Sequence, residues 1–271
     1  MFQRAILAGL VLAATAAGQS AATFTAASVK PSKPDDRGIA AQFLPGRLEM
    51  RNLPLHIIVA MAYNLPFQGP RLIGGPDWIR REHYDIEATA DTGTLKGVAR
   101  VNRMRQMLQV LLADRFKLTV RRESRELPVY AIVIAKEGPK LEKATVEESG
   151  CPDVRTTEGF ECHQFMGGQG RGLHGQAVDM ADLANYVENW AERPVVDKTG
   201  LKGLYKIETK PWLSMRPGPA PPAGAKGEDG SDLADLPTLF DVFTKLGLKL
   251  DAQKAPVEII EITGIERPVA N

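Results

Sequence analysis

The feature that most constrains the fold of this chain is a series of short segments that occurs twice in the same order. Residues 55–62 place apolar side chains at the spacing of one helix face, and residues 180–187 repeat that spacing. Downstream, the strand-like YDIEAT of residues 84–89 has a counterpart in YKIETK at residues 205–210. The later pairs are 104–111 with 236–243, 116–118 with 248–250, and 128–133 with 256–261. We therefore expect an internal duplication.

These segments predict an α+β fold in which each half runs strand, helix, strand, helix, strand, strand. Two copies are too few for an open solenoid, so we expect the halves to pack as one body or as two touching lobes. Asp179 is the expected N-cap of the helix at 180–187, and Gly247 is placed to end the helix at 236–243 in a left-handed conformation. Helices are expected at 55–62, 104–112, 180–187 and 236–243, and strands at 47–50, 84–88, 116–120, 129–134, 205–208, 248–250 and 257–262.

The duplication divides the chain into a first half at 24–141 and a second half at 172–269, with a linker loop at 142–171. The linker ends in a glycine-rich stretch, which we interpret as a flexible connector because the sequence shows neither a strand leading into it nor a helix directly after it, as a phosphate-binding loop would need. Within the second half, residues 215–231 read MRPGPAPPAGAKGEDGS. A tract of that composition cannot build a core, so we expect a disordered insert there.

The N-terminus predicts export. Arg4 is followed by a charge-free run of 13 residues at 5–17 and by small residues, which is typical of a signal peptide and too short for a confident membrane span. We expect the signal peptide at 1–18, with cleavage after Gly18 or, alternatively, after Ala22. The mature protein is then periplasmic or extracellular, and no later stretch is long and apolar enough to span a membrane.

The chain has two cysteines, Cys151 and Cys162. In an oxidising compartment two cysteines most simply form a disulfide, and closing a loop of this size stabilises the fold by roughly 3 kcal/mol in the chain-entropy description. The alternative is a metal site that adds His163 and His174. That set matches no zinc signature and has no paired C-x-x-C unit, so we favour the disulfide.

The net charge of the chain does not point to a particular class of partner. Lys and Arg number 34 against 33 Asp and Glu. Such a balance argues against nucleic acid or an anionic membrane surface as the main partner. The hydrophobic content of 44% is enough for a full core.

Standard catalytic motifs are absent from the sequence, which has no G-x-S-x-G elbow, H-E-x-x-H, Walker loop or EF-hand loop. We expect no catalytic residue, cofactor or bound metal. The weak candidate is a polar cluster of Asp77, His83 and Asp85, since a carboxylate beside histidine is able to transfer protons or bind metal. The second half offers no such charges at the equivalent place, and a histidine in a turn is more often simply solvated. A pair of carboxylates that hydrolyses glycosides stays an open alternative, because the distance between two carboxylates depends on the fold and is not given by the sequence.

Residues 197–200 read DKTG, the tetrapeptide in which P-type ATPases carry their phosphorylated aspartate. The nucleotide domain and membrane helices that such an aspartate works with are absent. Asp, Thr and Gly are turn formers, so we expect a turn that leads into the strand at 205–208.

Six ordered motifs carry a family resemblance: FTAASVKP at 24–31, GGPDWI at 74–79, LLADRFKL at 111–118, PVY at 128–130, VDKTGLKG at 196–203 and LGLKL at 246–250. Together they resemble the uncharacterised secreted paralogue family of Solibacter-type Acidobacteria, a domain of unknown function. Some relatives carry this domain on BlaR-type metallopeptidase sensors. The resemblance covers almost the whole mature chain and implies an extracytoplasmic sensing or binding module, without assigning any catalytic residue.

We therefore expect an exported, non-enzymatic module that binds a peptide, a protein or another cell-envelope ligand such as a glycan. An exposed sheet edge or the groove between the halves would provide the binding surface. The alternatives are a secreted hydrolase with an unrecognised carboxylate or histidine site, and a structural protein of envelope assembly. The sequence leaves the oligomeric state open.

Overall fold

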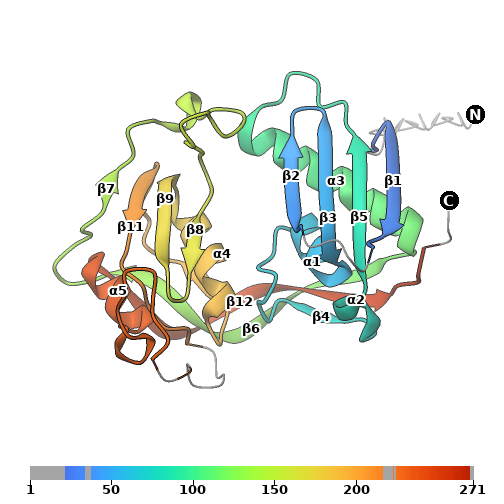
Figure 1. Ribbon diagram of the computed structural model, residues 1–271. Helices are drawn as coiled ribbons and strands as arrows, with labels where there is room; N and C mark the ends of the chain where they lie inside the picture. Colours follow the sequence, from blue (N-terminus) through green and yellow to red (C-terminus); the bar gives the residue numbers. More distant parts are fainter. Residues whose placement is uncertain (1–21, 34–37, 216–221, 223, 269–271) are drawn as a thin grey trace, which may run out of the picture.

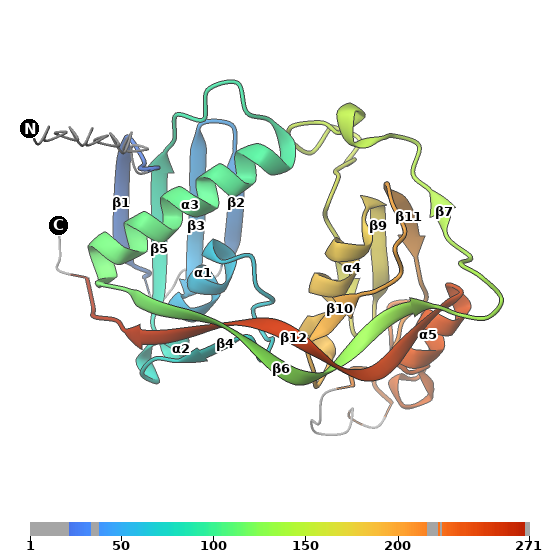
Figure 2. The ribbon, with the colours of Figure 1, turned by 180° about the vertical axis from the view of Figure 1, so that it is seen from behind.

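The computed structural model describes residues 22–33, 38–215, 222 and 224–268. These residues form three four-stranded sheets together with α-helices and short 3-10 turns. Figures 1 and 2 show two lobes that are joined by a long two-stranded ribbon. The predicted α+β class is confirmed. Within the described residues, no helix combines the length and the apolar character needed to cross a membrane.

The first lobe contains β1 (Ala26–Pro31), β2 (Ala40–Leu44), β3 (Arg47–Pro54) and β5 (His83–Thr89), in the spatial order β1-β5-β3-β2. Its helices are α1 (Leu55–Ala62), α2 (Trp78–Arg81) and α3 (Gly97–Phe116). In Figure 2, α1 and α3 lie over one face of the sheet. Buried and exposed side chains alternate along β3 and β5, as expected when only one face is covered. Leu48, Ile86 and Met104 belong to the core between that face and the helices.

The second lobe contains β7 (Glu142–Lys143), β8 (Met166–Gly168), β9 (Gly172–Val178) and β11 (Tyr205–Glu208), in the spatial order β7-β11-β9-β8. Its helices are α4 (Met180–Val187) and α5 (Leu239–Lys245), and its 3-10 turns are Glu148–Gly150, Glu188–Trp190 and Leu233–Asp235. The core of this lobe includes Leu173, Ile207 and Phe243. The two outer sheets thus have the same arrangement, in which the strand before α1 or α4 is central and a short strand lies on its inner side.

The third sheet joins the lobes. Its two long strands, β6 (Thr119–Ile134) and β12 (Leu248–Gly264), pair antiparallel along their whole length. Two short strands, β4 (Leu72–Gly74) and β10 (Val195–Asp197), add in parallel to β12 and β6, respectively. The ribbon runs from one core to the other, because Ile262 is buried in the first core while Ile132 is buried in the second.

Each long strand replaces two expected strands. The expected pairs 116–120 with 129–134, and 248–250 with 257–262, were separated by polar stretches that contain proline. In the structure the pairing continues through them, with Pro128 opposite Lys254 and Pro256 opposite Glu126. The ribbon has only two strands at this point, so a proline whose missing N–H would have faced outward costs no ladder hydrogen bond.

The bounds of two helices also differ from the prediction: α3 is longer than the expected helix at 104–112, and α5 is shifted relative to the one expected at 236–243. Phe116 was expected in a strand but is the last residue of α3, which ends where Lys117 adopts a left-handed conformation with φ of 50°. Leu236 was expected in the fourth helix but is extended, with ψ of 145°, because Pro237 follows it. Thr238 then starts α5 with a capping box to Asp241.

The predicted helix caps are confirmed. Asp179 Oδ1 accepts a hydrogen bond from Asp182 N, and Asp182 Oδ2 accepts one from Asp179 N, which completes a capping box at the start of α4. Gly247 has φ of 69° after α5. The expected turn at residues 197–200 is also present, since Asp197 Oδ1 accepts hydrogen bonds from Thr199 N at 2.8 Å and from Thr199 Oγ1 at 2.7 Å.

The expected linker loop at 142–171 differs from the structure at both ends, because β7 and β8 lie within it and join the second sheet. The glycine-rich stretch is the hairpin between β8 and β9. Its glycines permit close packing: a Cβ on Gly168 would lie 2.6 Å from the Trp190 ring, and one on Gly172 would lie 2.3 Å from Thr209 O. A residue with a Cβ atom would collide with these neighbours, so only glycine is tolerated at these two positions.

The expected signal peptide at 1–18 lies outside the described residues. Of the insert expected at 215–231, residues 216–221 and 223 also lie outside them. The described part forms a hydrogen-bonded turn, in which Glu228 N donates to Gly170 O at 2.9 Å and Gly227 N donates to Ser231 O at 2.8 Å.

Candidate functional site

The edges of the two outer sheets differ in how they are protected. An edge strand exposes unpaired backbone N–H and C=O groups, and proteins usually shield such edges with charges, prolines or short strands. The outer edges follow this rule, since β1 carries Lys30 and Pro31 and β7 consists of Glu142 and Lys143. The inner edge strands β2 (AAQFL) and β8 (MGG) carry neither charge nor proline. In Figure 1, β2 and β8 are the strands of the two lobes that lie nearest to each other.

The backbone of β2 points alternately toward β3 and away from it. Phe43 O accepts a hydrogen bond from Arg100 Nη1 at 2.6 Å, so this carbonyl points away from β3. Since the N–H and C=O of one residue in an antiparallel strand point to the same side, Ala41 also turns its backbone groups outward. Ala41 and Gln42 are exposed, and Ile39, directly before the strand, is 70% exposed. Among the described residues, no hydrogen bond uses the outward backbone groups of Ala41, which lie beside the apolar side chain of Ile39.

The edge of β8 is more occupied. Gly167 O accepts hydrogen bonds from Tyr186 Oη at 3.3 Å and from Arg171 Nη2 at 3.2 Å. Between the two inner edges, β2 is the one that is better able to take an additional strand.

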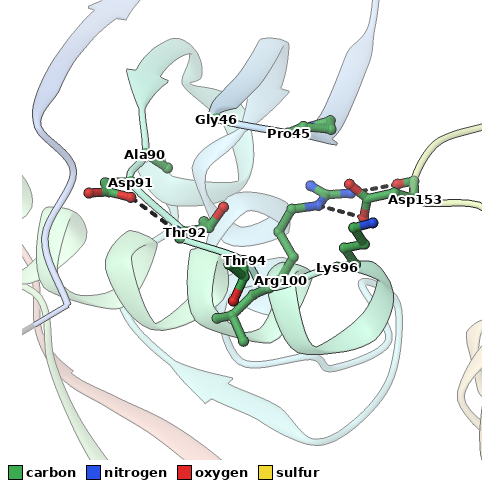
Figure 3. A pocket seen from close by; sticks show the side chains of 11 residues that line it. Pro45, Gly46, Ala90, Asp91, Thr92, Thr94, Lys96, Arg100 and Asp153 are labelled. Carbon is green, nitrogen blue, oxygen red and sulfur yellow. Dashed lines mark hydrogen bonds and ion pairs between the residues drawn. The ribbon is translucent and has the colours of Figure 1, made fainter.

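A pocket of about 300 Å³ lies at the end of β2, where the β2–β3 turn meets the segment before α3. Its lining includes Gly46, residues 90–96, Arg100 and Asp153. Figure 3 shows that the guanidinium of Arg100 and the carboxylate of Asp153 lie at one side of this pocket and bond to each other. The pocket thus combines a backbone turn with one ion pair, in which Arg100 is buried and Asp153 is partly exposed.

Arg100 and Asp153 form a network at the start of α3. Arg100 is 2% exposed, and its Nε lies 2.9 Å from Asp153 Oδ1 while its Nη2 lies 2.7 Å from Asp153 O. Gly97 N donates to Asp153 Oδ1 at 2.7 Å. Burial by itself raises the pKa of Asp153, but the hydrogen bonds from Gly97 and Arg100 outweigh it and hold this pKa below its ordinary value. The carboxylate of Asp153 is therefore ionised. From a distant segment of the chain, it accepts a hydrogen bond from a backbone N–H in the first turn of α3.

Asp153 belongs to the segment that the disulfide closes. The predicted bond between Cys151 and Cys162 is confirmed. Cys162 packs with Ala177 and Leu204 of the second lobe. The segment is thus anchored to the second lobe by packing and to the first lobe by Asp153.

A second contact joins the lobes beside the ribbon. Glu188 is fully buried, and its Oε1 lies 2.8 Å from Arg71 Nε while its Oε2 accepts a hydrogen bond from Val195 N at 2.9 Å. Gln68 N donates to Asn189 Oδ1 at 3.2 Å. A side chain at Gly69 would collide with this network, since its Cβ would lie 2.6 Å from Glu188 Oε1. The lobes are therefore held in place at two points, which fixes the surroundings of β2.

Arg105 of α3 lies beside the β2 edge. Its guanidinium carbon is 5.7 Å from the centre of the Phe43 ring, and its Nε is buried without a hydrogen-bond partner among the described residues. Desolvation lowers the pKa of Arg105, and the charge of Asp182 in the second lobe partly opposes this. One guanidinium N–H next to the edge is thus buried and has no acceptor among the described residues.

The structure places two of the three predicted polar-cluster residues around Asn52. His83 Nδ1 lies 2.8 Å from Asn52 Oδ1, and Asp85 Oδ1 accepts a hydrogen bond from Asn52 N at 2.8 Å. Asn52 has φ of 53° and lies at a register shift between β3 and β5. Asp77 lies at the N-cap position of α2, and no hydrogen bond or ion pair joins it to His83 or Asp85 among the described residues. His83 and Asp85 therefore hold a β-bulge.

Sequence reasoning did not select Arg100, Asp153 or Arg105. A signal for Arg100 exists, because it precedes Met104 by one helical turn and so lies on the apolar face of α3. A charge on that face requires a partner. The identity of the partner is not encoded locally, since Asp153 is distant in the sequence.

One family profile, described as "Protein of unknown function (DUF3738)", matches residues 56–265. No curated protein matches the chain, and no solved structure does.

Proposed function

The chain belongs to the DUF3738 family of proteins of unknown function, and from that premise we propose that it is an exported, non-enzymatic module that binds an extended peptide segment at the edge of β2. The observation that carries the proposal is the contrast between edges: β1 and β7 are protected by charge or proline, while β2 is not. An unprotected edge that persists beside protected ones favours a surface kept open for strand addition.

The bound peptide would extend the sheet of the first lobe. Its backbone would pair with the outward N–H and C=O of Ala41, which supplies affinity that does not depend on sequence. Its side chains would alternate, since successive residues of a strand point to opposite faces. Ala41 and Phe43 lie opposite Met50 and Leu48, which face the core, so peptide side chains on that face would be apolar.

Export is part of the proposal. The charge-free run after Arg4 supports a signal peptide, and the bond between Cys151 and Cys162 is compatible with an oxidising periplasmic or extracellular location. The resemblance to the Solibacter-type secreted family, with relatives on BlaR-type sensors, supports a role in sensing or binding outside the cytoplasm. The ligand is then a peptide or protein segment of the cell envelope.

We attribute the matching architecture of the lobes to the internal duplication that the sequence suggests. In support, β1, β5, β3 and β2 correspond in order and neighbours to β7, β11, β9 and β8. The short strands β4 and β10 each add in parallel to the long strand of the other half. The β2 edge would then be the copy that stayed open, while β8 is occupied by Tyr186 and Arg171.

The experiment starts from the full chain expressed for export and purified with its disulfide intact. Peptides are selected from a random display library, and their affinity is measured by fluorescence anisotropy. Ala41→Pro removes an outward N–H without breaking the ladder to β3, so the proposal expects at least a tenfold loss of affinity. Ala27→Pro is the matched control on the protected edge: Ser32 N donates to His83 O, which directs the backbone of Ala27 away from β5.

Ala27→Pro should bind as the unaltered protein does. Failure to select any peptide, or equal affinity of the two proline variants, would contradict the proposal. Analytical ultracentrifugation of the same samples tests whether a second copy of the chain, instead of a peptide, pairs with the edge of β2. A dimer that Ala41→Pro dissociates would show that β2 pairs with a second copy of the chain, and would also overturn the peptide proposal.

A further inference from the structure

A group of metal-ligating side chains lies at the start of α4, apart from the β2 edge. His163 Nδ1 is 2.7 Å from Asp182 Oδ2. Asp179, the N-cap of α4, is the third member: one donor atom from each of His163, Asp179 and Asp182 lies within 4.8 Å of the others. The imidazole comes from the end of the disulfide-closed segment and both carboxylates come from α4. Two separate segments therefore bring one nitrogen and two oxygen donors to one point.

The donor set suits a particular class of ion. Imidazole nitrogen combined with carboxylate oxygen is a ligand set of zinc and related divalent transition metals, at about 2.0–2.2 Å from the ion. Donors at such distances are separated from each other by roughly 3–4 Å. To share an ion, His163 Nδ1 and Asp182 Oδ2, which lie 2.7 Å apart, would separate slightly, while the Asp179 oxygen, which lies within 4.8 Å of both, would stay at its distance or move closer. The two carboxylates also supply the negative charge that balances a divalent cation. We propose that His163, Asp179 and Asp182 bind a zinc-type divalent cation, with His163 using Nδ1.

Glu148 completes the arrangement from the other side of the ring. Its Oε2 lies 3.0 Å from His163 Nε2. A metal-binding histidine typically donates its second ring N–H to a carboxylate, which fixes the tautomer and the ring orientation. Glu148 is therefore a positioning residue, because it would act on the ion through His163.

The disulfide holds this geometry together and also excludes a competing ligand set. Glu148, Cys151 and His163 likewise gather their donor atoms, but Cys151 is bonded to Cys162 and its sulfur is not a thiolate. His163 directly follows Cys162, so the covalent bond fixes the two segments that carry Glu148 and His163 relative to each other. The backbone N–H of His163 also donates to Ala177 O of β9 at 2.8 Å, which attaches the backbone of His163 to the sheet of the second lobe.

The site leaves room for further ligands. The side chains of His163 and Asp182 are 17% and 24% exposed. Water or a ligand group could therefore complete the coordination of an ion held by three protein donors. The sequence predicted no metal here, because 163, 179 and 182 follow none of the standard ligand spacings.

The test uses the full chain with its disulfide intact, stripped of metal by EDTA and titrated with Zn²⁺ in a calorimeter. The proposal expects one Zn²⁺ per chain at micromolar affinity or tighter, with Ca²⁺ at least a hundredfold weaker. His163→Asn should reduce Zn²⁺ affinity at least a hundredfold, and Asn tolerates the left-handed backbone of this position, where φ is 57°. Glu148→Gln should reduce it by about 10–100-fold, as expected for a residue that orients a ligand.

His174→Asn is the matched control, because His174 pairs with Glu208 alone at its Nδ1 and is more exposed. This variant should bind Zn²⁺ as the unaltered protein does. Absence of stoichiometric Zn²⁺ binding, or binding that His163→Asn leaves unchanged, would overturn the proposal. Equal affinity for Ca²⁺ would also overturn it by showing carboxylate binding without the imidazole. If circular dichroism shows that His163→Asn is unfolded, Asp179→Asn replaces it, with the same expected loss. The proposal is independent of peptide binding at β2.

Discussion

Asp153 satisfies the buried Arg100 from a segment 53 residues away, with its Oδ1 at 2.9 Å from Arg100 Nε. The same oxygen accepts a hydrogen bond from Gly97 N at 2.7 Å. One carboxylate of the disulfide-closed segment thus ties the second lobe to the start of α3. It also neutralises a guanidinium whose Nη1 occupies the outward carbonyl of Phe43 on β2.

Replacing this carboxylate should destabilise the protein. Asp153→Ala leaves the guanidinium of Arg100 buried without its counter-charge, so we expect a loss of about 3 kcal/mol in the free energy of unfolding, measured with urea. Glu82→Gln is the control, because the pair of Glu82 with Arg267 is exposed and should contribute little. A similar small effect of both substitutions would contradict the role assigned to Asp153.

The same ion pair should make the free energy of unfolding depend on pH in the acid range. The pKa of Asp153 lies below its ordinary value of 3.8 in the folded protein. A lowered carboxyl pKa gives stability that is fully present above 3.8 and is lost as the pH falls through the folded pKa. The stability difference between the unaltered protein and Asp153→Asn should therefore be constant from pH 5 to 7 and shrink below about pH 4. Urea unfolding at a series of pH values measures this, and a difference that grows in acid would have the wrong sign.

Breaking the disulfide should cost stability without unfolding the second lobe. The bond joins residues separated by 11 positions in the sequence. Opening a loop of this size should lower the free energy of unfolding by roughly 3 kcal/mol in the chain-entropy description. Thermal unfolding of the double variant Cys151→Ala, Cys162→Ala tests this against the unaltered protein. Adding reductant should lower the Tm of the unaltered protein only, and equal shifts in both proteins would point to an effect unrelated to the bond.

The buried pair beside the ribbon should be the stronger of the two lobe contacts. Glu188→Gln keeps an acceptor for Val195 N but removes the charge that balances Arg71, so we expect a loss of about 3–5 kcal/mol. Glu208→Gln is a suitable control, since the side chain of Glu208 is 46% exposed. Urea unfolding measures both variants, and a Glu188→Gln protein as stable as the control would show that Arg71 finds other compensation.

Periodic segments of the chain were predictable and long-range pairings were not. The helices at 55–62 and 180–187 and the strand at 205–208 have the expected bounds, because their apolar side chains follow the helix or strand period. The edge strand β2 was missed because AAQFL lacks a clear alternation and pairs with a neighbour on one side only. The middle of β6 and β12 was missed because its polar residues and prolines are tolerated only where the ribbon has two strands.

The candidate site was least accessible to sequence reasoning. Asp77, His83 and Asp85 were selected because they are close in the sequence, yet His83 and Asp85 share Asn52 while Asp77 lies apart. The residues around β2 come from three distant segments, and only the fold brings them together. The disulfide was predictable because a single pair of cysteines leaves one possible connectivity.

The most direct measurement of the central claim is amide hydrogen exchange of the exported protein with and without a library-selected peptide. Strand addition at β2 should slow exchange of the outward amide N–H groups of Ala41 and Phe43, because each would donate to or lie beside the peptide backbone. The outward amide of Ala27 on β1 should exchange at the same rate in both samples. Protection at Ala27 instead of Ala41, or a bound peptide that leaves Ala41 and Phe43 unprotected, would contradict binding at the β2 edge.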